Sequence, residues 1–231
     1  MSDRVKVRLR FEKYGAMKFI GHLDVMRYFQ KLIRRAGLDV AYSEGFHPHQ
    51  ILSFANPLGV GISSKGEYAD LVMESVTSSK DMVDALNREN VEGFFVTDIV
   101  RLPENAPNGM ASVDRADYEL TLSEEKYPDV SWLEDACKAL SEKEEVLIEK
   151  RTKKGMKTVD IKEGILELRC EDRVIFMKLR AGSALNIRPE QVLLAVFAQA
   201  GAELYPFSYD TLRLEQYDCD GKSLLSAGEV F

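Results

Sequence analysis

The chain has 231 residues, of which 45% are hydrophobic and 30% charged, a composition that excludes an intrinsically disordered chain. This length accommodates one large domain or two of ordinary size. The formal net charge of −7 argues against general affinity for nucleic acid, and the lack of a run of about 18 apolar residues argues against a membrane span.

The charge is unevenly distributed along the chain. Residues 1–54 carry ten Lys and Arg against five Asp and Glu, a net charge of +5. Residues 55–110 carry four against nine, a net charge of −5, and the remainder carries −7. A basic leading segment can bind a polyanion locally although the whole chain is acidic.

The cysteines do not form a metal or cluster motif. Cys137, Cys170 and Cys219 lie far apart and are odd in number, which is typical of reduced thiols in a cytoplasmic protein. We therefore expect neither an iron–sulfur cluster nor structural zinc in this chain. The N-terminal residues contain no apolar signal region, which also favours a cytoplasmic location.

The first half of the chain alternates strands and helices in the order βαββαβ. Apolar and charged residues alternate from Val5 to Phe11, which predicts a half-buried strand. Apolar residues at helical spacing predict a helix over Leu23–Ala36, which Gly37 is well placed to end. The other expected elements are strands over Ile51–Ala55 and Glu67–Val76, a helix from Ser78 or Ser79 to about Asn87, and a strand over Gly93–Arg101.

The alternation of strands and helices is repeated after a segment around residues 103–110, which contains two prolines and a glycine. The second half is expected to contain strands over Ala116–Leu122, Val146–Arg151, Lys157–Ile161, Ile165–Cys170, Val174–Leu179 and Tyr209–Tyr217, with helices over Trp132–Ser141 and from Pro189 to Ala200. We predict an α+β fold of two split-βαβ (ferredoxin-like) halves with mainly antiparallel sheets. Residues 1–102 would form the first domain, 103–110 a linker, and 111–231 the second domain with an added basic hairpin.

Residues 19–70 carry several short motifs in a fixed order: "FIGHLDVMRYFQKLIRRAGLDVAYSEGFHPHQILSFANPLGVGISSKGEYAD". This run resembles a bacterial family of radical-SAM-linked proteins of unknown function, whose members are encoded beside, or fused behind, a radical SAM protein. The matching positions are Gly21-His22-Leu23-Asp24, Arg27, Arg34-Arg35-Ala36-Gly37, Ala41-Tyr42-Ser43, Gly45-Phe46, Pro48-His49, Ser53-Phe54-Ala55, Pro57-Leu58-Gly59, Ser64-Lys65-Gly66-Glu67-Tyr68 and Asp70.

The resemblance implies that this chain is a partner or substrate-handling subunit of a radical SAM enzyme. On that view the 4Fe–4S cluster and SAM belong to the partner, and this chain holds no cofactor. Gln50 stands where the family often has proline. The resemblance supplies no established reaction.

The candidate catalytic residues are His22, Asp24 and His49. One interpretation places Asp24 in the first helical turn, where it complements the helix dipole, with His22 in the entry turn. The alternative joins these three residues as acid–base groups or metal ligands. No helical pair of ligands such as HExxH supports a metal, and we expect none.

The glycines at positions 59, 61 and 66 do not form a phosphate-binding motif. Lys65 precedes Gly66, whereas a Walker loop requires the reverse order, and a strand is expected to follow. We interpret the segment as a β-connection, whose backbone could still hold a phosphate. The expected recognition loop uses Ser43, His47, Ser53, Ser64, Lys65, Glu67 and Asp70.

Two groups of basic residues are the candidate RNA contacts. Arg27, Lys31 and Arg35 recur every four residues, with Arg34 beside them, on the polar side of the first helix. The second group is Lys150, Arg151, Lys153, Lys154 and Lys157, on the expected hairpin. The non-core face of the first strand carries Lys6, Arg8 and Arg10 instead of stacking aromatics, so it could form a charged seam between the halves.

Three functional hypotheses follow. The leading hypothesis is an accessory or substrate-presenting protein that works with a radical SAM enzyme and binds structured RNA. The second is an RNA-acting enzyme that uses His22, Asp24 and His49 as acid–base or metal groups. The third is a protein–protein scaffold that does not contact RNA.

Overall fold

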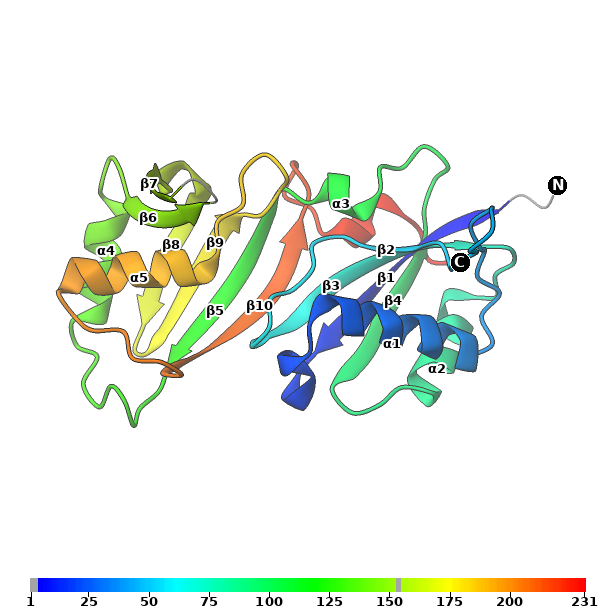
Figure 1. Ribbon diagram of the computed structural model, residues 1–231, viewed down its shortest axis with the longest axis horizontal. Coiled ribbons are helices and arrows are strands. Elements are labelled where there is room, and N and C mark those ends of the chain that lie inside the picture. The colour runs from blue at the N-terminus through cyan, green and yellow to red at the C-terminus, as the bar shows by residue number, and fades with distance from the viewer. Residues whose placement is uncertain (1–3, 153–154) are drawn as a thin grey trace. The chain divides into compact units, whose positions relative to one another are not determined.

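The computed structural model describes residues 4–152 and 155–231 (Figure 1). The chain divides into two compact units, residues 1–114 with 215–231, and residues 115–214. The expected boundary at 103–110 assigned 215–231 to the second half, whereas these residues pack with the first unit. Each described pair of strands with a defined register is antiparallel, and helices pack on the strands, so the fold is α+β.

The first unit follows the strand–helix order expected from the sequence. Its elements are β1 (Val5–Lys13), the short helix η1 (Gly15–Phe19), α1 (His22–Arg35), β2 (Leu52–Phe54), β3 (Ile62–Met73), α2 (Ser79–Arg88), β4 (Phe94–Arg101), α3 (Gly109–Ser112) and η3 (Leu224–Ala227). The strands are ordered β4-β1-β3-β2, so β2 lies at one edge. The expected strand over Glu67–Val76 begins earlier, at Ile62, because Lys13 pairs with Ser64 beyond a bulge in β1. It also ends earlier, at Met73, which pairs with Val5 at the start of β1.

The helices of the first unit pack on the apolar face of β1. Val7, Leu9 and Phe11 share one hydrophobic core with residues of α1 and α2, and the rings of Phe11 and Phe29 lie 4.6 Å apart. Gly37 follows α1 with a φ of +70°, and the amide of Leu38 donates to the carbonyl of Ile33. This left-handed residue ends the helix, as expected, since glycine adopts positive φ without strain.

The other face of β1 carries an ion-pair network centred on Arg8. Its side chain is fully buried, and its Nε and Nη2 donate to the two carboxylate oxygens of Asp70 at 2.6 and 2.9 Å. The same guanidinium donates to the carbonyl oxygens of Leu224 and Pro107, while the amide of Gly109 donates to Asp70. This network fastens the segment around residue 107 and the C-terminal η3 to the sheet of the first unit.

Arg10 continues the row of charges along β1. It lies 3.1 Å from the carboxylate of Glu215 and 3.9 Å from that of Asp98. The Tyr68 hydroxyl donates to the same Glu215, and burial is the main reason why the pKa of Tyr68 is raised. The row therefore finds partners inside the first unit, in the segment that returns at the end of the chain. The sequence alone suggested a seam between the halves.

The second unit repeats the alternation and adds a hairpin. Its elements are β5 (Arg115–Leu122), α4 (Leu133–Ser141), β6 (Leu147–Thr152), β7 (Gly155–Asp160), η2 (Lys162–Gly164), β8 (Ile165–Glu171), β9 (Val174–Arg180), α5 (Pro189–Ala200) and β10 (Tyr209–Tyr217), of which residues 215–217 belong to the first unit. The strands are ordered β10-β5-β9-β8, and β6 pairs with β7 in a separate two-stranded sheet.

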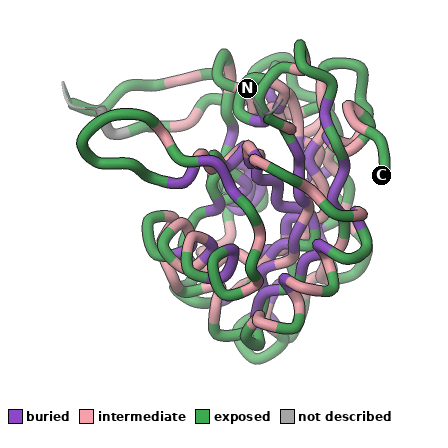
Figure 2. Tube along the Cα trace, turned by 90° about the vertical axis from the view of Figure 1, so that its right-hand side faces the viewer, coloured by how far each residue is buried: buried purple, intermediate pink, exposed green. Residues whose placement is uncertain are grey.

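Burial follows the strands and the inner faces of the helices (Figure 2). Pro189 begins α5 and Gly201, with a φ of +65°, ends it, as the sequence predicts.

Among the described residues, no helix combines the length and the apolar character that crossing a bilayer requires.

Candidate nucleic-acid interface

The basic residues of α1 lie on its exposed side. Val25, Phe29, Leu32 and Ile33 face the core, which leaves the opposite side of the helix to solvent. That side carries all four predicted contact residues, which are exposed: Arg27, Lys31, Arg34 and Arg35. The helix sequence therefore sorts apolar and basic residues onto two faces, as the spacing predicts.

Two of these four side chains have local partners. Arg27 lies 3.3 Å from Asp24 one helical turn away, and both are largely exposed. Arg35 donates to the carbonyl of Glu89 at 3.0 Å and lies over the ring of Tyr28. For Lys31 and Arg34, no partner is present among the described residues. The helix dipole favours Arg34 and Arg35 in the last turn, but it gives no reason for Lys31 in the middle.

The motif loop of residues 43–49 presents an exposed aromatic ring. Phe46 is fully exposed, and Gly45 before it has a φ of +106°, which a side chain at this position would oppose. Tyr42 at the start of the loop is 45% exposed and bridges to Gln50. An apolar ring held entirely in solvent forgoes the roughly 1.5–3 kcal/mol that burying it would contribute, so it is more consistent with contact to a partner.

Ser43 and His49 close the base of this loop. The Ser43 hydroxyl lies 2.8 Å from His49 Nδ1, and the backbone amide of His49 donates to the same hydroxyl oxygen at 3.1 Å. His49 Nδ1 also lies 3.4 Å from the carbonyl oxygen of His47, so the Ser43 hydroxyl and this carbonyl together orient the imidazole ring. These contacts involve Nδ1, so Nε2 lies on the side of the ring away from Ser43.

The loop is also attached to α1. Gln50 is 6% exposed, and its Nε2 donates to the carbonyl oxygen of Gln30 at 3.1 Å, in the middle of the helix. This bond connects the loop that holds Phe46 to the helix that holds Lys31 and Arg34. The first unit therefore supports an exposed aromatic residue and a row of basic residues on adjoining elements.

The three candidate catalytic residues have separate partners. His22 begins α1, and its ring packs edge-on against Phe54 at 5.3 Å; partial burial lowers the pKa of this imidazole. Asp24 lies in the first turn of α1 and pairs with Arg27, while His49 bonds to Ser43. Within residues 4–152 and 155–231, no group of three or more His, Cys, Asp or Glu side chains is placed to hold a metal ion.

The residues assigned to the recognition loop do not share one loop. Only Ser43 and the exposed His47 lie in it, whereas Ser53 lies in the edge strand β2. The others lie in β3: Ser64 and Glu67 are buried, Lys65 is exposed, and Asp70 pairs with Arg8. Of the three glycines, only Gly66 lies in β3, which pairs with β1. Asp70 has a structural role because both of its carboxylate oxygens bond to the buried Arg8.

The predicted basic hairpin is β6–β7 of the second unit. Lys153 and Lys154 lie outside the described residues, and so does the side chain of Arg151. Lys150 and Lys157 are both exposed and stand directly opposite each other in the register of the two strands. Like charges at cross-strand positions are destabilising, which is offset where a polyanion lies against them.

Two residues of this surface were missed when only the sequence was considered. Phe46 and Tyr42 supply exposed aromatic surface that the first strand lacks. The signal was present in "GFHPH", where a phenylalanine stands between glycine and histidine in a polar stretch, because a core strand would continue with further apolar residues.

Fold and surface together define an α+β protein whose first unit presents a basic helix beside an aromatic loop. Residues 6–189 match the family described as "Uncharacterized protein conserved in bacteria (DUF2344)", and the chain belongs to this family. No curated protein matches the chain. A similar solved structure is "Crystal Structure of an Unknown Protein from Galdieria sulphuraria", 12% identical, with a TM-score of 0.29 over 94% of this chain and 99% of that chain.

Proposed function

We propose that this protein binds structured RNA through α1 and the 43–49 loop and presents it to a radical SAM enzyme in the cytoplasm. The observation that carries the proposal is the fully exposed Phe46 on a loop bonded to the basic helix. On this proposal the chain supplies recognition, and its partner supplies the iron–sulfur cluster, SAM and the chemistry.

Phe46 is suited to stack on an unpaired base. Sequence-specific RNA recognition uses splayed bases in loops and bulges, which stack on aromatic side chains. Such stacking contributes about 1–3 kcal/mol per base. His47 and His49 follow Phe46 in the sequence, and the Nε2 side of His49 is suited to a hydrogen bond with a base edge or a phosphate oxygen. A stacking residue on a loop replaces the sheet platform that β1 does not provide.

The basic face of α1 is suited to the RNA backbone. Four basic residues against the single acid Asp24 give α1 a local excess of positive charge, although the chain carries −7. Phosphate contacts position an RNA without reading its sequence, and each contact releases counterions. Lys31 and Arg34 are the foremost contacts, because no partner is present for them in the described part of the chain.

The β6–β7 hairpin is a second proposed contact. The opposed Lys150 and Lys157 and the sequence neighbours Arg151, Lys153 and Lys154 make it the most basic segment of the second unit. A hairpin that holds two lysines face to face gains from phosphate between them.

The radical SAM partner is supported by the motifs of residues 19–70, which resemble radical-SAM-linked proteins. The cysteine spacing agrees with a chain that leaves the cluster to its partner. We also infer that each half is ferredoxin-like. This inference is supported by the order βαββαβ in each half, once β6–β7 is set aside, and by the matching strand orders β4-β1-β3-β2 and β10-β5-β9-β8.

The test is binding of labelled bulk tRNA to the purified full-length chain at two salt concentrations, measured by fluorescence anisotropy. Phe46→Ala should weaken binding about fivefold to 100-fold, as stacking of one base predicts. Phe207→Ala is the matched control, because Phe207 is also fully exposed but lies in the second unit. The double variant R34A/R35A should reduce the salt slope by roughly one for each phosphate that the variant no longer binds.

Arg88→Ala is the control for the arginines, since Arg88 is an exposed arginine in the last turn of α2. The interface does not lie on α1 and the 43–49 loop if Phe46→Ala and Phe207→Ala bind tRNA equally well. The same conclusion follows if R34A/R35A and Arg88→Ala have the same salt dependence of binding. RNA turnover by the chain alone would favour the enzyme hypothesis with His22, Asp24 and His49. Capture of a radical SAM protein without any RNA binding would favour the scaffold.

A further inference from the structure

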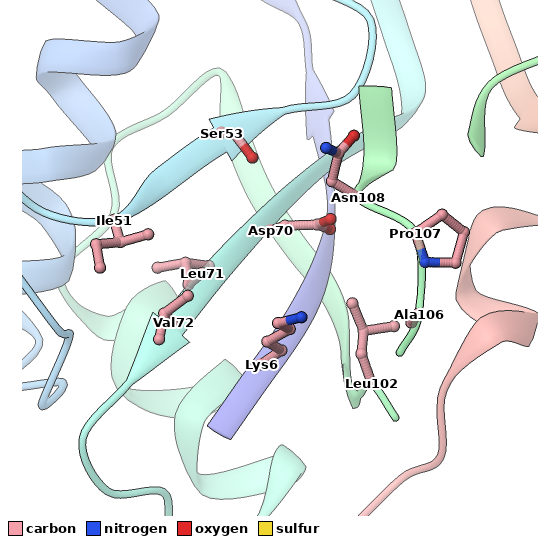
Figure 3. Close-up of a pocket in the computed structure, with 10 residues that line it drawn as sticks. All are labelled: Lys6, Ile51, Ser53, Asp70, Leu71, Val72, Leu102, Ala106, Pro107 and Asn108. Atoms are coloured by element: carbon pink, nitrogen blue, oxygen red, sulfur yellow. The ribbon is translucent and has the colours of Figure 1, made fainter. Parts of the chain in front are cut away.

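We propose a second site in the first unit: a pocket that binds a small organic monocarboxylate with an apolar body. The pocket has a volume of about 330 Å³ and lies between the edge strand β2 and the segment around residue 107 (Figure 3). Its polar lining residues are Lys6, Ser53, Asp70 and Asn108. The site is independent of the proposed RNA interface, which uses α1 and the 43–49 loop.

The wall of the pocket is fixed by hydrogen bonds. The carbonyl oxygen of Pro107 accepts from Arg8 at 3.1 Å, and the amide of Gly109 donates to Asp70 at 2.6 Å. A side-chain carbon added to Gly109 would lie 3.0 Å from the Cβ of Ala55, so glycine allows this close approach. The segment is therefore attached to buried groups of the sheet, and the pocket is preformed, as is usual for ligand sites.

Each polar group that remains available in the pocket can donate a hydrogen bond, and the nitrogens of Lys6 and Asn108 can only donate. The Asn108 side-chain oxygen accepts from the amide of Ala111, which leaves its amide nitrogen without a partner among the described residues. Lys6 Nζ uses one N–H on the carbonyl oxygen of Glu104 at 2.7 Å, and an ammonium has two more. The hydroxyl of Ser53 can also donate. A ligand that complements this pocket must therefore supply acceptors.

The charge of the lining selects a single negative charge. The carboxylate of Asp70 is held by both nitrogens of Arg8 and by the amide of Gly109, so its charge is compensated. The ammonium group of Lys6 then gives the pocket lining one positive charge, which one carboxylate of a ligand would balance. Lys6 would hold the carboxylate, while Ser53 and Asn108 would donate to a further acceptor atom of the ligand where it has one.

The rest of the lining is apolar and limits the size of the ligand. Ile51, Leu71, Val72, Leu102, Ala106 and Pro107 complete the wall. A volume of about 330 Å³ lies near the lower end of the roughly 300–1,000 Å³ typical of small-molecule sites, which suits a small ligand. A phosphorylated nucleoside is larger and more highly charged than this lining accommodates.

The test is titration of the ¹⁵N-labelled full-length chain with 3-phenylpropanoate, followed by NMR, with 3-phenylpropanamide as the neutral probe of the same shape. With 3-phenylpropanoate we expect saturable chemical-shift changes in the backbone amides of Ser53, Ala106 and Asn108. We expect 3-phenylpropanamide to bind at least tenfold more weakly. Lys6→Met should weaken the binding of 3-phenylpropanoate by about tenfold. Lys65→Met is the control, since Lys65 is exposed on β3 outside the lining and should leave binding unchanged.

Ala106→Phe gives a second variant that fills the pocket without altering its charge. It should abolish the shifts at Ser53, and the spectrum of the unbound variant reports whether it is folded. Equal affinity for the two probes, shifts confined to residues outside the pocket, or no saturation at millimolar carboxylate would each overturn the proposal.

Discussion

Replacement of Asp70 tests whether this motif residue is structural. Arg8 is fully buried and donates to both carboxylate oxygens of Asp70, at 2.6 and 2.9 Å. Asp70→Ala would leave this guanidinium buried with only the carbonyl oxygens of Leu224 and Pro107, and would leave the amide of Gly109 unpaired. Removing one partner of a buried ion pair costs about 3–5 kcal/mol, a large share of the roughly 5–15 kcal/mol that stabilises a domain.

Urea unfolding is the assay, with two probes that report on different units. Hydrogen exchange of peptides from β1 and β3 follows the first unit. Fluorescence of Trp132, the one tryptophan in the chain, follows the second. The stability measured in β1 and β3 should fall by about 3–5 kcal/mol in Asp70→Ala.

The double variant R8M/D70L shows whether the loss of stability comes from the unpaired charge of Arg8. Replacing both charges by apolar side chains removes the unpaired ion, so this variant should be less destabilised than Asp70→Ala. A loss of stability below about 1 kcal/mol in Asp70→Ala, a value typical of an exposed pair, would refute the structural role. It would return Asp70 to the candidate ligand contacts.

Three further predictions concern pH, thiols and iron. Partial burial lowers the pKa of His22, so the unfolded chain binds a proton at this residue more readily than the folded chain does. The free energy of unfolding should therefore fall as pH drops through about 6.5 toward the folded pKa. In His22→Phe the melting temperature should depend less on pH between about pH 7.5 and pH 5. A hydrogen bond to Cys170 and burial raise the pKa of the Cys137 thiol, so mass spectrometry should find iodoacetamide on the exposed Cys219 and none on Cys137 until the chain is denatured. Anaerobic reconstitution should leave no cluster on the isolated chain; stoichiometric iron and sulfide, abolished by Cys→Ala replacement, would contradict this.

Local patterns were sufficient to predict most elements. The alternation in β1, the apolar face of α1 with Gly37 after it, and Pro189 with Gly201 around α5 each depend on neighbouring residues, and the structure confirms them. These signals are local because one face of each element is buried while its ends need a residue with special backbone freedom.

Long-range pairing could not be predicted from the sequence. The beginning of β3 depends on Ser64 meeting Lys13, and Asp70 depends on Arg8, 62 residues earlier in the chain. The return of residues 215–231 to the first unit likewise has no local signal. The basic face of α1 was predictable from its spacing, and the polar surroundings of Phe46 gave a local signal of its exposure, whereas the bond that attaches the loop to α1 joins Gln50 to Gln30, 20 residues earlier, and has no local signal.

Ultraviolet crosslinking of the full-length chain to bulk tRNA, with the crosslinked peptides identified by mass spectrometry, tests the RNA interface most directly. We predict crosslinks at Phe46 or His47 and in the peptide that contains Lys31 and Arg34, and we expect these crosslinks to disappear at high salt. Crosslinks confined to other parts of the chain, or equal yields from the wild type and Phe46→Ala, would contradict the proposed interface.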